Sequence, residues 1–211
     1  GDGELSALGS EFFSKSGQPV YIGRAPGRLD VMGGIADYSG SLVLQMPIAE
    51  AAIAAFQVCN AGHIVVASFG AEANGRTPSL TLPLRETLFD GTSPRPLEAL
   101  KGVFDGASKW AAYVVGVLGV LAHEPETKEK IFECAGCSIV IRSAVPEGKG
   151  VSSSAAVEVA TMMAVLAGLE IRLTPSERIA QLCQRVENFV VGAPCGIMDQ
   201  MASSLGQQGK L

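Results

Sequence analysis

The sequence has few charged and few aromatic residues, and this scarcity excludes several classes of protein. Of its 211 residues, 18% are charged and 6% are aromatic, and the net charge is −5. Proteins that bind nucleic acid or an anionic membrane through their surface carry an excess of basic residues, which this chain lacks. We therefore predict neither nucleic acid nor a membrane among its partners.

Long apolar runs and targeting signals are also missing. No apolar run reaches the length of a membrane span. The first residues, Gly1 to Glu4, have neither the basic nor the apolar region of a signal peptide. There is no initiator methionine, so we expect a chain processed or excised from a longer protein. Together these absences predict a cytoplasmic location.

Cysteine and histidine are too sparse to predict a disulfide framework or a zinc site. The five cysteines are an odd number without a framework pattern, and Cys134-x-x-Cys137 has no second pair. The two histidines, His63 and His123, are isolated. We expect reduced thiols, as in a cytosolic protein, and a packing role for Cys195.

The length and the 47% hydrophobic content predict a globular chain with a sizeable core. There is no internal repeat and no low-complexity linker. We divide the chain into a lead-in, residues 1–18, with a helix expected from Glu4 to Ser16, and one domain, residues 19–211.

The segment from Val145 to Ala156 is rich in glycine and serine and organises the rest of the prediction. An apolar run, Cys137 to Arg142, predicts a strand before it, and Ala155 to Ala167 predicts a helix after it. Free N–H groups and the dipole at a helix N-terminus favour phosphate there. The alternative is an ordinary cap and turn, since the spacing fits neither a P-loop nor a dinucleotide fingerprint.

A second glycine-rich segment follows a strand expected over residues 19–25. Pro26-Gly27-Arg28 predicts a sharp turn, and a loop dense in glycine continues to Gly40. We expect Arg28 to neutralise an anion and Asp37 to accept hydrogen bonds from hydroxyl groups. The alternative is a long surface loop.

The middle of the chain mixes strand and helix signals. The alanine-rich run from Ala49 to Val58 is compatible with a helix by propensity. Ile64–Ser68 and Leu80–Leu82 predict strands of an antiparallel meander. Residues 70–79 and 83–107 predict loops with at most short helices, because they are rich in Gly, Pro and Asp.

Three helices are expected in the second half besides the one after the glycine loop. Ser108 to His123 has helical periodicity and predicts an amphipathic helix against the core, whose Trp110 could also stack on a base. Thr174-Pro175-Ser176-Glu177 predicts a capping box that starts a helix ending near Val191. A helix from Ile197 to Gly206 places Asp199 in its first turn, where a capping carboxylate is the alternative role.

Three separated segments together resemble the motifs of the GHMP kinases. Ala25–Arg28 through Asp37-Tyr38 is similar to their first motif, and Pro146–Ala156 to their phosphate-binding motif. Gly192–Gln200 is similar to the galactokinase segment that carries the catalytic Asp. The resemblance implies an α+β fold of the ribosomal protein S5 domain 2-like type, with a mixed or antiparallel sheet. The family's C-terminal ferredoxin-like domain is not in this chain, so we expect a fragment that is inactive alone.

The resemblance also implies ATP and Mg²⁺ as cofactors and assigns roles to residues. Asp199 would accept the proton of the anomeric hydroxyl of a sugar, Arg28 would pair with Asp199, and Ser154 and Glu187 would hold Mg²⁺. Sugar contacts would come from Gly34, Asp37, Gly196 and Asp199. The nucleotide would contact Trp110, beside the adenine pocket, and the loop residues Gly148, Lys149, Gly150, Val151, Ser152, Ser153 and Ser154. Lys149 either reaches a phosphate or is solvated.

One departure from the galactokinase pattern concerns the sugar. Galactokinases read Gly-Glu-His where this chain has Gly33-Gly34-Ile35, and in the family that Glu and His line the hydroxymethyl end of the hexose. A pentose such as L-arabinose has no such group, and the run Leu29–Gly40 is similar to the L-arabinokinase branch. The resemblance therefore favours phosphorylation of L-arabinose at its anomeric hydroxyl. Galactokinase activity and a catalytically silent sugar sensor are the alternatives.

Overall fold

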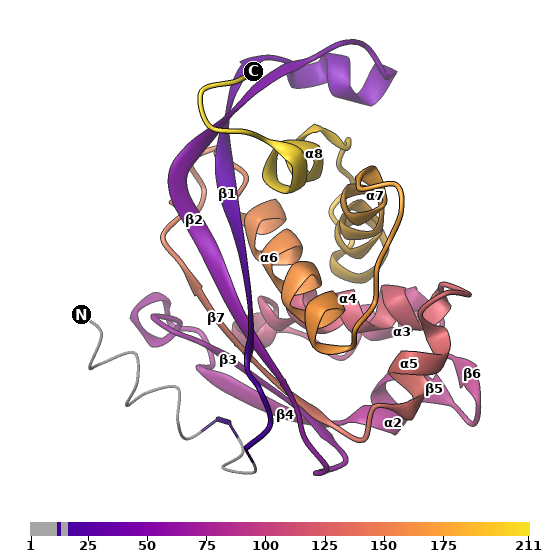
Figure 1. The fold of residues 1–211 in the computed structure, drawn as a ribbon. Helices are drawn as coiled ribbons and strands as arrows, with labels where there is room; N and C mark the ends of the chain where they lie inside the picture. Colours follow the sequence, from indigo (N-terminus) through magenta and orange to yellow (C-terminus); the bar gives the residue numbers. More distant parts are fainter. Residues whose placement is uncertain (1–11, 14–16) are drawn as a thin grey trace.

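A five-stranded sheet with helices on one face forms the domain (Figure 1). The computed structural model describes residues 12–13 and 17–211. The helix expected over Glu4–Ser16 lies outside the described residues, apart from residues 12 and 13. Within the described part of the chain, no helix is both long and apolar enough to cross a membrane.

The sheet is mixed, as the resemblance implies. Its strands are β1 (Tyr21–Met32), β2 (Leu44–Val58), β3 (His63–Ser68), β4 (Ser79–Pro83) and β7 (Cys137–Ser143), in the order β1-β2-β7-β3-β4. β7 runs antiparallel to β2 and parallel to β3. The strands expected at 64–68 and 80–82 are confirmed as an antiparallel pair. The simple meander is wrong, because β7 lies between β2 and β3.

The turn predicted at Pro26-Gly27-Arg28 is wrong, because β1 continues through it. The pairing of β1 with β2 shifts register between Pro26 and Arg28, so the irregularity is a bulge inside the strand. A Cβ on Gly27 would lie 2.7 Å from both the Val145 side chain and the Val151 carbonyl oxygen. The glycine therefore allows the glycine–serine loop to approach β1 closely.

The helix considered for Ala49–Val58 is also wrong, since these residues belong to the 15-residue strand β2. Its pairing to β1 on one side and β7 on the other satisfies its backbone groups. Alternate positions towards its end, Ala52, Ala54 and Phe56, are buried against the helices. Tertiary pairing here overrides the helix propensity of alanine.

The helical layer consists of α4 (Ala111–His123), α6 (Ser153–Gly168), α7 (Glu177–Arg185) and α8 (Met198–Leu205). Figure 1 shows α6 lying against β1 and β2, with α7 beyond it and α8 beside the upper part of β1. A Cβ on Gly23 of β1 would lie 2.0 Å from the Ala160 carbonyl oxygen. The backbone of α6 therefore rests directly on the backbone of β1.

The amphipathic helix expected over Ser108–His123 is present as α4, but it is buried nearly all round. Every residue of α4 except Tyr113 and His123 is buried. A helix that is apolar on all faces belongs in the interior. α4 is therefore a core helix, and one side of it packs on the segment that follows α7.

The expected end near Val191 is confirmed, although the helix changes type on the way. α7 passes into a π-helical segment, η4 (Val186–Val191), which ends at Gly192 in the left-handed conformation. The capping box with Thr174 as cap and Pro175 as first helical residue is wrong, because α7 begins only at Glu177, after Ser176, and has no side-chain cap hydrogen bond. The helix predicted to stop at Gly206 is confirmed as α8.

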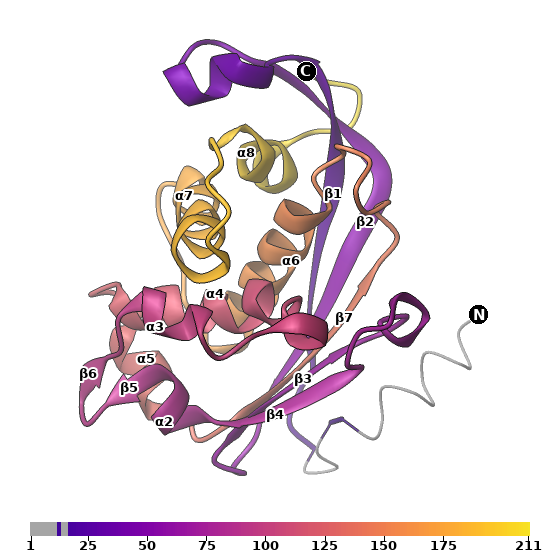
Figure 2. The same cartoon turned by 180° about the vertical axis from the view of Figure 1, so that it is seen from behind.

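The expectation of loops with short helices between the main elements is confirmed. Figure 2 shows several of these small elements gathered at one end of the molecule. The small sheet formed by two strands of two residues each, β5 and β6, was not predicted. The short elements are η1 (Gly34–Ser39), η2 (Glu72–Asn74), α2 (Leu84–Leu88), β5 (Phe89–Asp90), β6 (Ser93–Pro94), α3 (Leu97–Lys101), η3 (Gly106–Ser108) and α5 (Lys128–Glu133).

Candidate active site

The glycine–serine loop joins β7 to the N-terminus of α6, as the sequence predicts. Gly148 and Gly150 have φ values of +66° and +69°, and a Cβ added to either would meet no described atom within 4 Å. The loop therefore exposes its backbone to open space. A 16-residue helix directs its first N–H groups towards this space, which is an arrangement suited to phosphate.

Ser152 shows the local strain that often accompanies a binding site. It is the N-cap of α6 in the left-handed conformation, with φ +58° and ψ +48°. Its hydroxyl is buried, caps nothing and has no hydrogen-bond partner among the described residues. A strained residue with an unpartnered hydroxyl fits a loop that closes around a ligand's oxygens.

A cavity of about 610 Å³ opens beside the loop. Gly148, Ser153 and Ser154 line it on the loop side. Trp110, the residue expected beside a base, also lines the cavity and is nearly buried, with its indole N–H donating to the Thr77 carbonyl at 2.9 Å. The cavity is within the volume range of small-molecule sites.

The polar residues of this cavity that were missed from the sequence include Arg76, Glu147 and Tyr113. Arg76 and Glu147 form a two-pronged ion pair at its rim, with nitrogen–oxygen distances of 2.9 and 2.5 Å. Tyr113 lies in the wall, and burial, followed by the charges of Glu187 and Glu158, raises the pKa of its phenol to about 12. Arg76 lies in a segment without periodicity, so no sequence signal placed it here.

Lys149 is on the loop but is exposed and is not among the residues that line the cavity. Gly150, Val151 and Ser152 also lie outside the lining. Instead, the carbonyls of Gly150 and Val151 face β1, where both accept hydrogen bonds from Arg28. The loop therefore has one side towards the cavity and the other towards Arg28.

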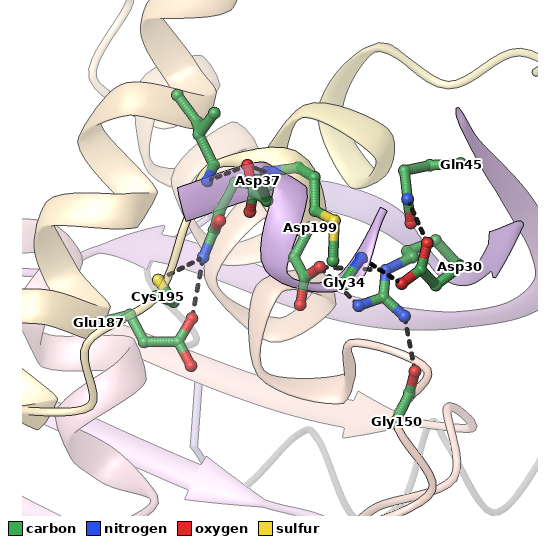
Figure 3. Close-up of polar contacts among 12 residues, drawn as sticks. Asp30, Gly34, Asp37, Gln45, Gly150, Glu187, Cys195 and Asp199 are labelled. Carbon is green, nitrogen blue, oxygen red and sulfur yellow. Dashed lines mark hydrogen bonds and ion pairs between the residues drawn. The ribbon is translucent and has the colours of Figure 1, made fainter. Parts of the chain in front are cut away.

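Arg28 and Asp199 form the ion pair that the motifs imply (Figure 3). The Arg28 Nε and Nη2 atoms donate to Asp199 Oδ1 at 3.0 and 2.6 Å. Arg28 Nη1 donates to the Gly150 carbonyl at 2.5 Å. The Arg28 side chain is 7% exposed and that of Asp199 26%. The alternative of a merely capping Asp199 fits less well, because its carboxylate faces Arg28.

Asp37 lies beside Asp199, but in the structure its carboxylate caps helix α8. Its oxygens accept the backbone N–H groups of Ile197 and Met198 at 3.1 to 3.2 Å. A Cβ on Gly196 would lie 1.8 Å from Asp37 Oδ2. Gly196 is therefore a glycine because Asp37 occupies the space of a side chain, and the two predicted sugar residues are in contact.

The segment that follows β1 presents two positions without packing partners. Gly34 has φ +55°, and an added Cβ there would meet no described atom within 4 Å. Ile35 is 86% exposed. The Gly34 N–H donates to Asp30 Oδ2 at 2.8 Å, which anchors the start of η1. This part of the site is open, and the surface-loop alternative is replaced by a short helix that contacts α8.

Glu187, the second residue expected at a metal, lies in the π-helical segment η4. It is nearly buried, and burial raises the pKa of its carboxyl while hydrogen bonding to Ser154 and Cys195 opposes that rise. π-helical turns are frequent at functional sites. The structure therefore brings together Ser154 and Glu187, the two residues expected to hold Mg²⁺.

The donor set fits Mg²⁺ only in company with a nucleotide. Within the described residues there is no group of three or more His, Cys, Asp or Glu that could hold a metal. Mg²⁺ is usually held by one or two carboxylates, waters and substrate phosphates. A hydroxyl and a carboxylate next to a phosphate-compatible loop match that pattern.

A buried polar cluster behind Glu187 was also missed from the sequence. The Gln200 amide donates to Glu187 Oε2 at 2.8 Å and to Glu158 Oε2 at 3.3 Å. Burial, and then the charge of Glu187, raises the pKa of Glu158 well above its ordinary value. A signal existed: Glu158 lies four residues after Ser154 on one helix, which places both on the same face. Cys195 packs here, with its sulfur 3.8 Å from the Gln200 amide.

Two family profiles match parts of this chain. Residues 112–207 match the family profile described as the GHMP kinases N terminal domain. Residues 10–58 match the galactokinase galactose-binding signature. The first match contains the glycine–serine loop and α8, and the second contains Arg28 and Asp37.

Curated relatives include kinases of two sugars. The chain is 46% identical to an L-arabinokinase of Arabidopsis thaliana, over 92% of this chain and 20% of that protein. It is 35% identical to a galactokinase of Bos taurus, over 98% of this chain and 48% of that protein. The chain thus spans about half the length of the galactokinases that it matches.

Solved structures show the same fold. Lactococcus lactis galactokinase complexed with galactose superposes with a TM-score of 0.68 at 26% identity, over 94% of this chain and 46% of that one. A D-glycero-D-manno-heptose 1-phosphate kinase gives a TM-score of 0.67 at 21% identity, which supports the fold alone. With the motif matches and the geometry of Arg28, Asp199 and the glycine–serine loop, the chain belongs to the GHMP kinase superfamily and is galactokinase-like.

Proposed function

We propose that the full-length protein containing this chain is an ATP-dependent kinase that phosphorylates the anomeric hydroxyl of L-arabinose, giving L-arabinose 1-phosphate. One observation carries the kinase part of the proposal. The Arg28 guanidinium binds the carboxylate of Asp199 and the carbonyl of Gly150 at once, and so joins the sugar end of the site to the phosphate loop.

The roles of the chain's own residues follow from this arrangement. Asp199 Oδ1 is engaged by Arg28, and Oδ2 accepts no hydrogen bond within the described residues, so Oδ2 is available for the proton of the sugar hydroxyl. Arg28 orients the carboxylate and offsets negative charge as the phosphoryl group moves. Phosphoryl transfer depends mainly on such positioning and charge stabilisation.

The nucleotide would lie in the cavity, with its base near Trp110 and its phosphates along Gly148–Ser154. Backbone N–H groups at the start of α6 bind anionic oxygens. Ser154 and Glu187 would hold Mg²⁺, which when bound would neutralise phosphate charge. Lys149 is exposed at the edge of the loop and would contact solvent or an outer phosphate oxygen.

The preference for a pentose rests on Gly34 and Ile35. Gly34 offers no side chain and Ile35 offers no polar atom, so the site presents no carboxylate or imidazole there to a hydroxymethyl group. A buried acceptor left without its hydroxyl is costly, and this chain avoids that cost for a sugar without a hydroxymethyl group. The 46% identity to an L-arabinokinase supports the same reading.

Galactokinase activity is the second candidate, and the match of residues 10–58 to the galactose-binding signature favours it. A silent sugar sensor is less well supported, since Ser152–Ser154 and Asp199 are all present. We further propose that residues 19–211 form the N-terminal ATP- and sugar-binding domain of a longer kinase. This chain alone should then be inactive.

The decisive experiment is a kinase assay of the full-length protein with L-arabinose and with D-galactose. We expect a higher kcat/KM for L-arabinose and formation of the 1-phosphate. Asp199→Asn, which keeps the shape of the side chain, should lower kcat about 10²- to 10⁴-fold. Equal or better use of D-galactose would overturn the pentose preference, and wild-type activity of Asp199→Asn would overturn the role of Asp199.

A further inference from the structure

Two cysteines at the start of β7 take no part in the proposed kinase site. Cys134 ends helix α5, and Cys137 is the first residue of β7, whose other end leads to the glycine–serine loop. All five cysteines of the chain are free thiols in the structure. The pair therefore needs an explanation separate from phosphoryl transfer.

A two-residue turn separates the two cysteines, and the Cys134 thiol donates to the Gly136 carbonyl within it at 3.4 Å. A Cβ on Gly136 would come within 3.0 to 3.2 Å of backbone atoms of residues 59, 62 and 63. Only glycine fits this close approach, so the two-residue turn that joins Cys134 to Cys137 is fixed against the backbone of residues 59–63.

The two thiols differ in access. Cys134 lines a second cavity of about 290 Å³, together with Lys130 and Glu133. Cys134 is 8% exposed, whereas Cys137 is 0% exposed. A small molecule that enters this cavity therefore meets Cys134, whereas Cys137 is fully buried.

The two thiols also differ in acidity, and the more exposed thiol is the more acidic one. Hydrogen bonding from Cys137 is the largest cause that lowers the pKa of Cys134 to about 7, against the opposing effect of burial. Hydrogen bonding to Cys134, and then burial, raises the pKa of Cys137 well above its ordinary value. Near neutral pH, the accessible sulfur is thus partly thiolate and the buried one keeps its proton.

We propose that Cys134 and Cys137 form a peroxide-sensitive dithiol, in which Cys134 is attacked first and Cys137 resolves it to a disulfide. The Cys134 thiolate attacks one oxygen of hydrogen peroxide, an S–O bond forms, the O–O bond breaks, and hydroxide leaves. The Cys137 sulfur then displaces the oxygen of the sulfenic acid, which leaves as water with the Cys137 proton. Two thiols are oxidised and one peroxide is reduced to two waters.

Cys59 is the nearest competitor for Cys137. Its backbone N–H donates to the same Gly136 carbonyl at 2.8 Å, and its charge contributes to the raised pKa of Cys137. Cys134 ranks before Cys59 among the causes of the raised pKa of Cys137, and Cys59 does not line the cavity. The geometry therefore favours the pair Cys134–Cys137.

The test is differential alkylation with peptide mass spectrometry on the full-length protein, reduced and then exposed to hydrogen peroxide. We expect the peptide with Cys134 and Cys137 to lose two hydrogen atoms and to regain them with dithiothreitol. The rate of Cys134 alkylation should rise with pH about a midpoint near 7. In Cys137→Ser, a dimedone-reactive sulfenic acid should accumulate on Cys134.

Cys59→Ser is the matched control, and it should leave the disulfide unchanged. A disulfide between Cys59 and Cys137, or no oxidation of Cys134 before that of Cys183 or Cys195, would overturn the proposal. The wild-type measurement decides the matter even if a variant fails to fold. No kinase activity is measured, so failure here is independent of the proposed function.

Discussion

Arg28 is the residue at which the two halves of the candidate site meet. Its three guanidinium nitrogens contact one carboxylate oxygen and one carbonyl oxygen, from segments 171 and 122 residues away in the sequence. The planar fork of arginine makes these bonds simultaneously, which the single ammonium of lysine cannot do. A lysine at this position would keep the positive charge but could not form the same set of hydrogen bonds.

Arg28→Lys should consequently lower kcat by about 10²-fold, as expected when one charge-stabilising donor is lost. The KM for the sugar should change less than kcat, since Arg28 contacts Asp199 but none of the other proposed sugar residues. Steady-state kinetics of the full-length protein measure both constants. Arg24→Lys is the control, because Arg24 lies on the same strand and donates to the exposed Ala49 carbonyl, away from Asp199. An unchanged kcat in Arg28→Lys would contradict the prediction.

Residue 196 is a second position at which the site requires one residue type, in this case glycine. Gly196→Ala would place a Cβ 1.8 Å from Asp37 Oδ2, and either Asp37 or the start of α8 must move. We expect a loss of about 1–3 kcal/mol of stability, as for overpacking, together with a large loss of activity. Thermal unfolding and the kinase assay measure the two effects.

Gly102→Ala is the matched control for Gly196→Ala. Gly102 has a right-handed helical conformation, and an added Cβ would lie 3.8 Å from its nearest neighbour, the Ala99 carbonyl oxygen. It should be neutral or slightly stabilising. Similar behaviour of the two variants would show that the contact with Asp37 does not govern the site.

Glu158 supports a prediction about pH. Its folded-state pKa is raised, first by burial, so the folded protein holds this proton more tightly than the unfolded chain, whose glutamates titrate near 4.3. The proton on Glu158 therefore makes its full contribution to the free energy of unfolding below about pH 4.3. This contribution is lost as the pH rises towards the folded-state pKa. Glu158→Gln carries no titrating proton, so it should lessen this fall.

Urea unfolding of the wild type and of Glu158→Gln across about pH 4 to 8 measures the slope. Glu129→Gln serves as the control for removal of an exposed glutamate. A steeper fall in Glu158→Gln than in the wild type would reverse the sign and refute the assignment.

At the scale of elements, the sequence predicted best where chemistry and pattern coincide. The strand–loop–helix unit of β7, the glycine–serine loop and α6 was predicted, because glycine, serine and apolar periodicity change together there. The resemblance of the motifs predicted that Arg28 would pair with Asp199. Their contact depends on β1 and α8 lying side by side, which no local pattern contains.

Predictions failed where partners distant in sequence decide the local structure. Ala49–Val58 has the composition of a helix, but two neighbouring strands make it β2. Pro26-Gly27-Arg28 has the composition of a turn, but its glycine serves the approach of Val145 and Val151. Gln200 and Glu158 were missed, because their meeting depends on how α8 packs against α6.

For the whole molecule, the contact that tolerates a substitution least is the one between the sheet and the helical layer. Gly23→Ala would place a Cβ 2.0 Å from the Ala160 carbonyl oxygen, where neither backbone can yield without separating α6 from β1. We expect a loss of about 3 kcal/mol or more of stability, which many single domains cannot tolerate. Chemical unfolding measures it, with Ile22→Ala, an exposed neighbour on β1, as the control. Equal stability of the two variants would contradict it.

The position of β7 in the sheet has a consequence for synthesis of the chain. β1–β2 and β3–β4 are each local hairpins that can pair as soon as they leave the ribosome. Their facing edges, β2 and β3, stay unpaired until residues 137–143 have emerged and been inserted between them. An unpaired strand edge is a template for association with other chains. The nascent protein is therefore most in need of a chaperone in the interval between translation of β4 and translation of β7.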